Sequence, residues 1–150
     1  MSDLLTYAQQ LQTRRFQNRS EVFDPVRKLW VALTPEEMVR QSLLIYLIKR
    51  GYEPTLIAVE KQITIGEVSF RFDVIVFDEK FKPLILVECK APEVALNQEV
   101  FDQVARYNWK VQAPYFILTN GVVLLIGKHD NDKRAYEILN ELPEKQKSDL

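Results

Sequence analysis

The chain has 150 residues, 47% of them hydrophobic, and a formal net charge of −1 at pH 7. This length and apolar content suit a full hydrophobic core, so we expect residues 1–150 to form a single domain. One cysteine excludes an internal disulfide and one histidine excludes a histidine-rich zinc site, so any metal would be bound by oxygen ligands. The weak net charge argues against tight nucleic-acid binding by this domain alone.

The sequence lacks the usual signals for nucleotide binding, secretion and membrane insertion. Neither a G-x-x-x-x-G-K-[ST] loop nor a G-x-G-x-x-G turn is present. The N-terminus lacks the basic and apolar regions of a signal peptide, and no apolar run approaches the roughly 18 residues of a membrane span. We therefore expect a cytoplasmic protein with no membrane contact.

Residues 1–33 are expected to form an N-terminal helical extension. Apolar residues at helical spacing predict a helix over residues 3–15. Arg14, Arg15 and Arg19 then form a basic cluster, which is either a solvated face or a set of contacts to phosphate groups.

A second helix is expected from Pro35 to about residue 50. Thr34 is a typical N-cap, proline is favoured at the first helical position, and Glu37 can complete a capping box. Gly51 is expected to end this helix. At about 100° per residue, Glu37 also lies in line with the apolar stripe of the helix. Glu37 is therefore either a capping residue or a carboxylate aimed at the site described next, with Glu36 as the alternative.

Three apolar runs predict the strands of an antiparallel meander. They cover residues 56–65, 70–77 and 84–90. Residues 66–67 are expected to form the first turn, and residues 78–83 connect the second and third strands.

The second hairpin predicts a pair of facing carboxylates. If it folds symmetrically about Lys80 and Phe81, facing residue numbers sum to about 161, and Asp73 falls opposite Glu88. Such side chains, with Cβ atoms about 4.5–5.5 Å apart, repel each other without a cation and can jointly hold Mg²⁺. Lys90 shares the face of Glu88 and is placed to act on a water or a phosphate oxygen. The alternative is two ordinary strands whose charges face solvent or form salt bridges.

Two other residues near this pair have simpler explanations. Glu60, in the first strand of the meander, is expected to be a surface or salt-bridged residue rather than a metal ligand. Cys89 lies between Glu88 and Lys90 and points to the opposite face of its strand, where a small buried apolar side chain fits.

A third helix is expected over residues 97–112, with Asn97 as its cap. Gln103 and Tyr107 stand at i and i+4, so both project from one edge of this helix.

The C-terminal part is expected to add strands and a tail. Residues 115–119 and 122–126 predict two strands joined by an Asn-Gly turn, and residues 128–134 a polar loop. Residues 135–139 predict a last strand, and residues 141–150 a flexible charged tail. The order of helix, three-strand meander, helix and further strands predicts an α/β fold, in which helices flank a central mixed sheet.

Asp73, followed after fourteen intervening residues by Glu88-Cys89-Lys90, in this order of elements, resembles the PD-(D/E)XK nuclease superfamily. Further segments resemble the N-terminal nuclease domain of the R subunit of type I restriction enzymes, over most of residues 20–127. These segments are residues 24–27 (DPVR), 33–41 (LTPEEMVRQ), 86–92 (LVECKAP), 101–108 (FDQVARYN) and 118–121 (LTNG).

The resemblance implies a restriction-endonuclease-like core and a Mg²⁺- or Mn²⁺-dependent endonuclease that hydrolyses phosphodiester bonds of double-stranded DNA. It implies that Asp73 and Glu88 are metal ligands, with the backbone carbonyl of Cys89 as a further one. It also implies that Lys90 assists the attacking water and that Glu37 is the acid of the first core helix.

The resemblance further implies that Gln103 and Tyr107 correspond to a Q-x-x-x-Y element that supports the site and the DNA backbone. The R subunit carries an ATP-driven translocase after its nuclease, whereas this chain has none, so a translocase or other restriction-system subunits are the expected protein partners. The alternative is a catalytically inactive nuclease-fold domain that acts as a nucleic-acid-binding or protein-interaction module.

Overall fold

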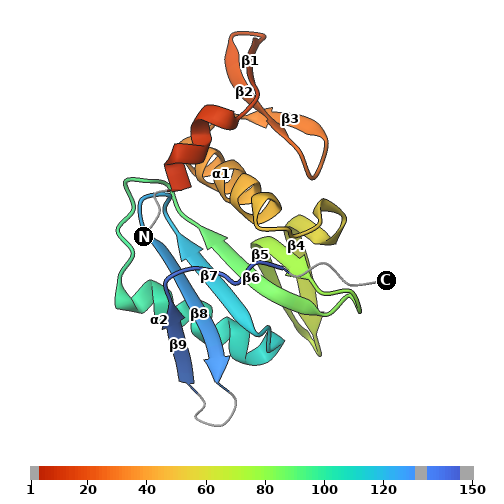
Figure 1. The fold of residues 1–150 in the computed structure, drawn as a ribbon, viewed down its shortest axis with the longest axis vertical. Coiled ribbons are helices and arrows are strands. Elements are labelled where there is room, and N and C mark those ends of the chain that lie inside the picture. Colours follow the sequence, from red (N-terminus) through yellow and green to blue (C-terminus); the bar gives the residue numbers. More distant parts are fainter. Residues whose placement is uncertain (1–3, 131–134, 146–150) are drawn as a thin grey trace.

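The structure is a computed structural model that describes residues 4–130 and 135–145. Its strands form a three-stranded sheet, in the order β1-β2-β3, and a six-stranded sheet, in the order β4-β5-β6-β7-β8-β9 (Figure 1). The elements in chain order are η1 (Leu4–Gln10), β1 (Thr13–Phe16), β2 (Arg19–Asp24), β3 (Leu29–Ala32), α1 (Pro35–Lys49), η2 (Pro54–Leu56), β4 (Ile57–Ile65), β5 (Val68–Phe77), β6 (Pro83–Cys89), α2 (Gln98–Val111), β7 (Tyr115–Thr119), β8 (Leu124–Asp130) and β9 (Ala135–Leu139).

The N-terminal segment differs from the predicted helical extension. A short 3₁₀ helix, η1, replaces the first part of the helix expected over residues 3–15, and residues 13–32 form the antiparallel sheet β1-β2-β3. Gln17 and Asn18 have φ values of 49° and 64°, which suit a two-residue hairpin turn. The expectation was wrong because contacts between strands outweigh the local helical preference.

Helix α1 has the predicted limits and cap. The Glu37 backbone N–H donates to Thr34 Oγ1 at 3.0 Å, and Pro35 occupies the first helical position. The helix ends at Lys49, and Gly51 follows with a φ of +95°, a conformation that favours glycine. Its predicted apolar stripe is buried, with Val39, Leu43, Leu44 and Leu47 all fully inaccessible.

The six-stranded sheet is mixed, as predicted. β4, β5 and β6 form an antiparallel meander, β6 pairs with β7 in parallel, and β7, β8 and β9 are again antiparallel. Helix α2 provides the crossover between the two parallel strands. The predicted α/β class and its central mixed sheet are therefore confirmed.

The two faces of this sheet are covered by different helices. The face toward α1 contributes Val74, Val76, Ile85 and Val87 to a cluster with the apolar stripe of that helix. The other face packs under α2, where the buried residues are Phe72, Ile75, Leu86, Val104, Ala105, Ala113, Phe116 and Leu118. The sheet is thus the middle of three layers, as Figure 1 shows.

The C-terminal part extends further into the fold than predicted. β8 runs to Asp130, so residues 128–130 of the expected loop lie in a strand, and residues 131–134 lie outside the described residues. β9 has the predicted limits. Residues 141–145 do not form a flexible tail, because Leu142 fills the core and the Tyr52 hydroxyl donates to the Pro143 carbonyl at 3.0 Å. Residues 146–150 of the expected tail lie outside the described residues.

Within residues 4–130 and 135–145, no helix is both long and apolar enough to cross a membrane.

Candidate active site

The predicted register of the β5-β6 hairpin is confirmed. Val74 pairs with Val87, Ile75 with Leu86 and Val76 with Ile85, so each pair of residue numbers sums to 161. Continued by one residue, this register places Asp73 opposite Glu88. The Cys89 backbone N–H donates to Asp73 Oδ2 at 2.8 Å, which holds the carboxylate of Asp73 against the end of β6.

The charges of this pair act on each other. Burial, followed by the negative charge of Asp73, raises the pKa of Glu88 to about 8, while the nearby charge of Lys90 opposes the rise. The protein therefore holds two carboxyl groups at one place without enough positive charge to keep both ionised at neutral pH. Such a pair of oxygen donors fits a divalent cation, which would supply the missing charge.

Lys90 follows the last residue of β6 and is positioned by β7. Its backbone N–H donates to the Thr119 carbonyl at 2.8 Å, which continues the parallel pairing of the two strands. Cys89, one residue earlier, points into the α1 side of the core with 1% of its surface exposed. Burial, followed by the charge of Asp73, raises the pKa of its thiol well above the usual range. The prediction that Cys89 is a small buried residue on the opposite face is confirmed.

The strands are irregular where they carry their acids. In β5, Phe70 and Phe72 pack on the α2 side, but Val74 packs on the α1 side, so the alternation of faces is interrupted at Asp73. The neighbouring β4 has a matching irregularity, because Glu60 adopts a φ of +54°. Such irregularities redirect side chains out of the regular pleat and recur beside active sites.

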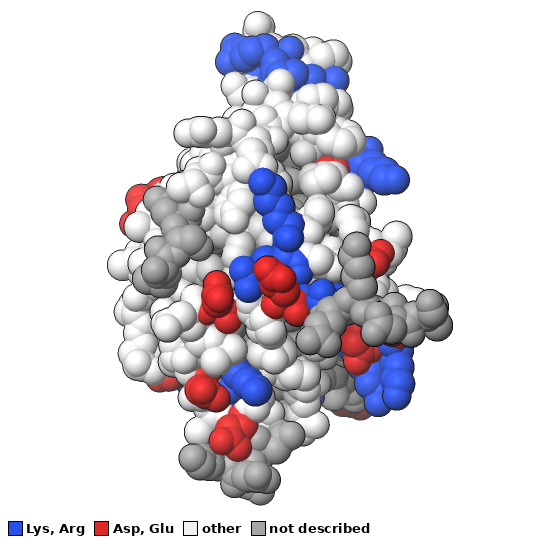
Figure 2. All heavy atoms as spheres, viewed as in Figure 1, with Lys and Arg blue, Asp and Glu red and all other residues white. Residues whose placement is uncertain are grey.

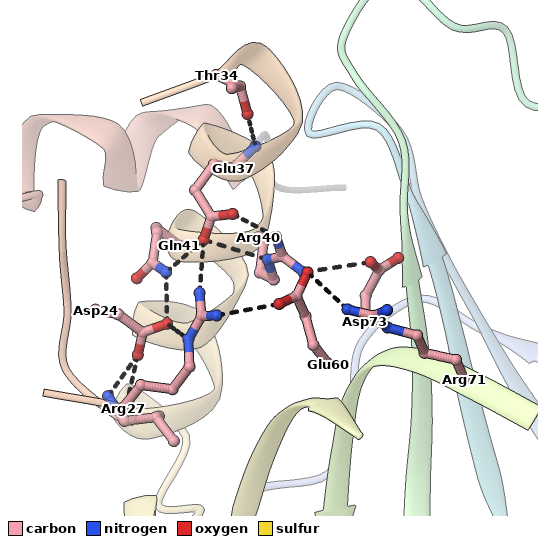
Figure 3. A network of polar contacts seen from close by, with 10 residues as sticks. Asp24, Arg27, Thr34, Glu37, Arg40, Gln41, Glu60, Arg71 and Asp73 are labelled. Carbon is pink, nitrogen blue, oxygen red and sulfur yellow. Dashed lines mark hydrogen bonds and ion pairs between the residues drawn. The ribbon is translucent and has the colours of Figure 1, made fainter. Parts of the chain in front are cut away.

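A network of ion pairs joins Asp73 to helix α1 (Figure 3). The Arg40 guanidinium lies 3.4 Å from Asp73 Oδ1 and 3.4 Å from Glu60 Oε1, and it also donates to both carboxylate oxygens of Glu37. Burial opposes the charge on Arg40, but the hydrogen bond and charge of Glu37, with the charges of Asp73 and Glu60, raise its pKa above the usual value. Arg40 thus serves as the shared counter-ion of three acids.

Arg27 extends this network to the N-terminal sheet. It lies in the turn between β2 and β3, and its guanidinium bonds Asp24 at 2.8 Å, Glu37 at 3.2 Å and Glu60 at 3.3 Å. Asp24 is fully buried and also accepts a hydrogen bond from Gln41 at 2.9 Å. Side chains from β2, α1 and β4 are therefore tied together beside the carboxylate of Asp73, as Figure 3 shows.

The predicted third carboxylate has a different environment from the pair. The Glu37 side chain is held by Arg27, Arg40 and Gln41, and only its backbone N–H takes part in the cap. Glu36 is exposed, and its charge is among those that raise the pKa of the Cys89 thiol, after burial and Asp73. In the part of the chain that the structure describes, no three His, Cys, Asp or Glu side chains are grouped to hold a metal.

Gln103 and Tyr107 lie side by side on α2, as predicted. The Gln103 side-chain amide donates to the Tyr107 hydroxyl at 3.0 Å. The Tyr107 ring lies 5.5 Å from the ring of Phe70, and both line a small groove with Ser69 and Arg71. This pair is therefore placed beside β5, the strand that carries Asp73.

The interpretation of Glu60 is confirmed, whereas the arginines were missed. Glu60 is exposed and forms ion pairs with Arg27, Arg40 and Arg71. Arg40 follows Glu37 by three residues, a spacing at which an acid and a base interact on a helix, and it interrupts an otherwise apolar stripe. Arg27 offered no comparable signal, because it lies in a turn and two of its three acidic partners, Glu37 and Glu60, are distant in the sequence.

Comparison with known protein families finds a match. The model of the family described as "Type I restriction enzyme R protein N terminus" matches residues 35–143. The chain belongs to this family. The match covers α1, the meander with Asp73 and Glu88, α2 and the following strands. Comparison with curated protein sequences finds no match.

A solved structure has the same fold as this R-protein N-terminal domain. It is a fragment of a protein assigned as the HsdR subunit of a type I restriction enzyme from Vibrio vulnificus YJ016. The TM-score is 0.54 at 20% sequence identity, over 74% of the present chain. The alignment covers 24% of the Vibrio chain, so the domain spans about a quarter of that relative.

The raised pKa of Glu88 predicts a pH-dependent effect of Glu88→Gln on stability. A folded-state pKa above the unfolded value means that the folded protein binds more protons between about pH 4.5 and pH 8, so its stability falls as pH rises. Glutamine at position 88 does not titrate, so it removes this fall of stability with pH. In EDTA, the stability of E88Q relative to wild type should increase by on the order of 2 kcal/mol from pH 5 to pH 8, measured by urea unfolding.

The matched control for this experiment is Glu79→Gln, which removes one carboxylate from the exposed turn between β5 and β6. Parallel stability curves for E88Q and wild type, or the same change for E79Q, would contradict the prediction.

The ion-pair network predicts that Arg40→Met is strongly destabilising. Arg40 is 7% exposed, and its loss leaves Glu37 with Arg27 and the neutral Gln41, and Asp73 without a guanidinium partner. Removing one partner of a buried ion pair costs about 3–5 kcal/mol, which urea unfolding at pH 7 would measure.

Glu60→Gln is the control at the solvent-facing end of the same network, where we expect a change of less than about 1 kcal/mol. The double variant R40M/E37Q should recover part of the loss, because it removes one stranded acid. An R40M protein as stable as E60Q would show that the network contributes little.

Proposed function

We propose that this domain is a Mg²⁺- or Mn²⁺-dependent endonuclease that hydrolyses phosphodiester bonds in double-stranded DNA. One observation carries the proposal. The β5-β6 hairpin brings Asp73 and Glu88 together, burial and the charge of Asp73 raise the pKa of Glu88 to about 8, and Lys90 follows two residues after Glu88. Membership of the type I restriction enzyme R-protein family supports this choice of reaction.

Asp73 and Glu88 are the proposed ligands of the cation, with the backbone carbonyl of Cys89 as a further oxygen donor. The Asp73 carboxylate is oriented by the Cys89 N–H on one oxygen and by Arg40 on the other. When bound, a divalent cation supplies Lewis acidity to a phosphate oxygen and to the attacking water. Because Glu88 must lose its proton to bind a cation, metal binding and proton release are coupled at this residue.

Lys90 is proposed to assist the attack on the phosphodiester. Its ammonium lies near Glu88, where it stabilises negative charge, and its backbone is fixed by Thr119. An ammonium group held beside the reacting phosphate hydrogen-bonds the water nucleophile and stabilises the negative charge that develops on the phosphate oxygens. A fixed backbone beneath a flexible side chain lets the ammonium follow that charge during the reaction.

Of the acids on α1, Glu36 and Glu37 play different proposed parts. Glu37 is proposed as the acid of the first core helix, and in the metal-free arrangement it neutralises Arg40 and Arg27. Glu36 remains the alternative, since it is exposed and its charge reaches Cys89.

Gln103 and Tyr107 are proposed to support the DNA backbone beside the site. Their hydrogen bond fixes the hydroxyl and amide groups on one edge of α2, and Tyr107 packs against Phe70 of β5. Polar side chains of this kind hydrogen-bond phosphate and sugar oxygens without reading the base sequence.

The whole enzyme is proposed to need partners. The domain has a net charge of −1 and spans about a quarter of the Vibrio HsdR relative. A translocase or other restriction-system subunits would bring DNA to the site and supply the energy for movement along it. We propose that the domain acts in the cytoplasm, where such DNA is found.

The second candidate function is a catalytically inactive module that binds DNA or another protein. The observation in its favour is the arginine network, because Arg40 occupies one side of Asp73 and Glu37 is committed to ion pairs. This candidate predicts DNA or protein binding that is independent of divalent cations.

The nuclease proposal predicts that Lys90→Ala and Asp73→Asn abolish cleavage of supercoiled plasmid DNA in Mg²⁺ or Mn²⁺. Loss of a group that acts on the reacting atoms lowers the rate by about 10²–10⁴-fold. EDTA should abolish cleavage by the wild type. Product formation on agarose gels, followed over time, measures these rates.

The control is Lys80→Ala, which removes an exposed lysine from the β5-β6 turn and should cleave at the wild-type rate. Wild-type cleavage that continues in EDTA, or that K90A retains in full, would refute the proposed site. Binding of plasmid DNA without any cleavage would favour the inactive module.

A further inference from the structure

The three-stranded sheet β1-β2-β3, residues 13–32, projects from the body of the domain and is called the arm below (Figure 1). Five Lys or Arg and two acids lie in the arm, so its net charge is +3 in a chain of net charge −1. Figure 2 shows Lys and Arg atoms gathered over the projecting end formed by β1 and β2, while acidic atoms lie lower on this face. The arm is therefore net positive, while the rest of the chain is net negative.

Two arginines at the tip of the arm are held in fixed positions. Arg14 and Arg19 bond different oxygens of the Glu21 carboxylate, at 2.9 Å and 2.6 Å. The hydrogen bond from Arg19 is the main cause that holds the pKa of Glu21 below its usual value, so this acid stays ionised. The Arg14 guanidinium also lies over the Trp30 ring, 4.3 Å from its centroid, and over Phe16.

This ordering suits the binding of an anion. The arginine side chains stay 38% and 59% exposed although their partner Glu21 is buried, so part of each guanidinium faces solvent. Side chains that are already ordered lose less conformational entropy when they bind, and a guanidinium matches the geometry of a phosphate. Two arginines on one carboxylate leave one net positive charge at this point.

Arg15 adds a further cation on the same turn. Its contacts are the Asn18 carbonyl at 3.3 Å and the Ser20 hydroxyl at 3.5 Å, both exposed to solvent. Within residues 4–130 and 135–145, no ion pair involves Arg15. Its charge is therefore available for an external partner.

The base of the arm lies beside the candidate active site. Arg27, in the β2-β3 turn, bonds Glu60, and Glu60 shares Arg40 with Asp73. A strand of six residues such as β2 is about 20 Å long, which corresponds to about six base pairs along a DNA strand. The tip can thus reach phosphates a few base pairs away from a bond that lies at Asp73.

We propose that the tip of the arm, with Arg14, Arg15 and Arg19, binds the phosphate backbone of duplex DNA several base pairs from the scissile bond. The choice of DNA as ligand rests on the proposed function. The arm carries a net positive charge, whereas the rest of the domain is net negative, and the ordered base of the arm fixes the direction in which the DNA leaves the site. Contacts of this kind position DNA without reading its sequence.

The test uses the full chain and a fluorescein-labelled DNA duplex of about 20 base pairs in EDTA, where anisotropy measures binding without cleavage. Each phosphate contact contributes about 0.9 to the slope of log affinity against log salt. The double variant R15A/R19A should therefore bind about 10-fold more weakly at low salt, with a slope smaller by about 2. R15A alone removes no partner of a buried acid, and it should reduce the salt slope by about half as much as R15A/R19A does.

The matched control is K80A/K82A, which removes two exposed lysines from the β5-β6 turn and should keep the wild-type affinity and slope. Circular dichroism and urea unfolding would show that each variant is folded. The proposal is overturned if wild type shows no salt-dependent duplex binding, if R15A and R15A/R19A bind as wild type does, or if K80A/K82A loses as much. It is also overturned if polyglutamate competes as well as unlabelled duplex at equal charge.

Calorimetric titration with Mn²⁺ separates this proposal from the proposed nuclease function. R15A/R19A should bind Mn²⁺ as wild type does, because its substitutions lie outside the Asp73–Glu88 pair. If the wild type neither takes up Mn²⁺ nor cuts DNA, but R15A/R19A binds the duplex more weakly than the wild type, the nuclease function is refuted and the arm proposal stands.

Discussion

The close approach of Asp73 and Glu88 is the constraint on which the arrangement of the site depends. Two unit charges about 5 Å apart repel each other by about 3 kcal/mol at an effective dielectric constant of about 20. The register of the hairpin forces this proximity. If the strands slipped by one residue, the neighbouring apolar pairs, such as Val74 and Val87, would move to the wrong faces of the sheet. Packing of the core thus keeps the two acids together, and burial of Glu88, followed by the charge of Asp73, raises the pKa of Glu88.

The surrounding residues stabilise the charge of Asp73 more than the charge of Glu88. Asp73 has an arginine and a backbone N–H, whereas Glu88 has the charge of Lys90 and a raised pKa. Arg40 is itself shared with Glu37 and Glu60, so it does not fully neutralise Asp73. This leaves a demand for one more positive charge at the end of β6. The same ion pairs also hold the base of the basic arm, through Arg27. The acidic site and the basic arm are therefore joined by one network.

Local patterns predicted the parts of the fold that depend on neighbours in sequence. Thr34 and Pro35 indicated the start of α1, and the symmetry of one hairpin gave the pairing around Asp73. The N-terminal sheet was missed because Arg14 is held by Glu21 and Trp30, contacts that no helical periodicity encodes. The arginine network was missed because most of its contacts join a turn, a helix and a strand that are distant in the sequence, although Arg40 and Glu37 stand at helical spacing. The packed segment around Leu142 also depends on distant contacts.

The most direct test of the account is a crystal structure of the protein soaked in Mn²⁺, with anomalous scattering recorded from the metal. The account predicts an anomalous peak bound by carboxylate oxygens of both Asp73 and Glu88, and the loss of that peak in crystals of Asp73→Asn. A map with no peak at this pair, or with manganese bound only by other residues, would contradict it.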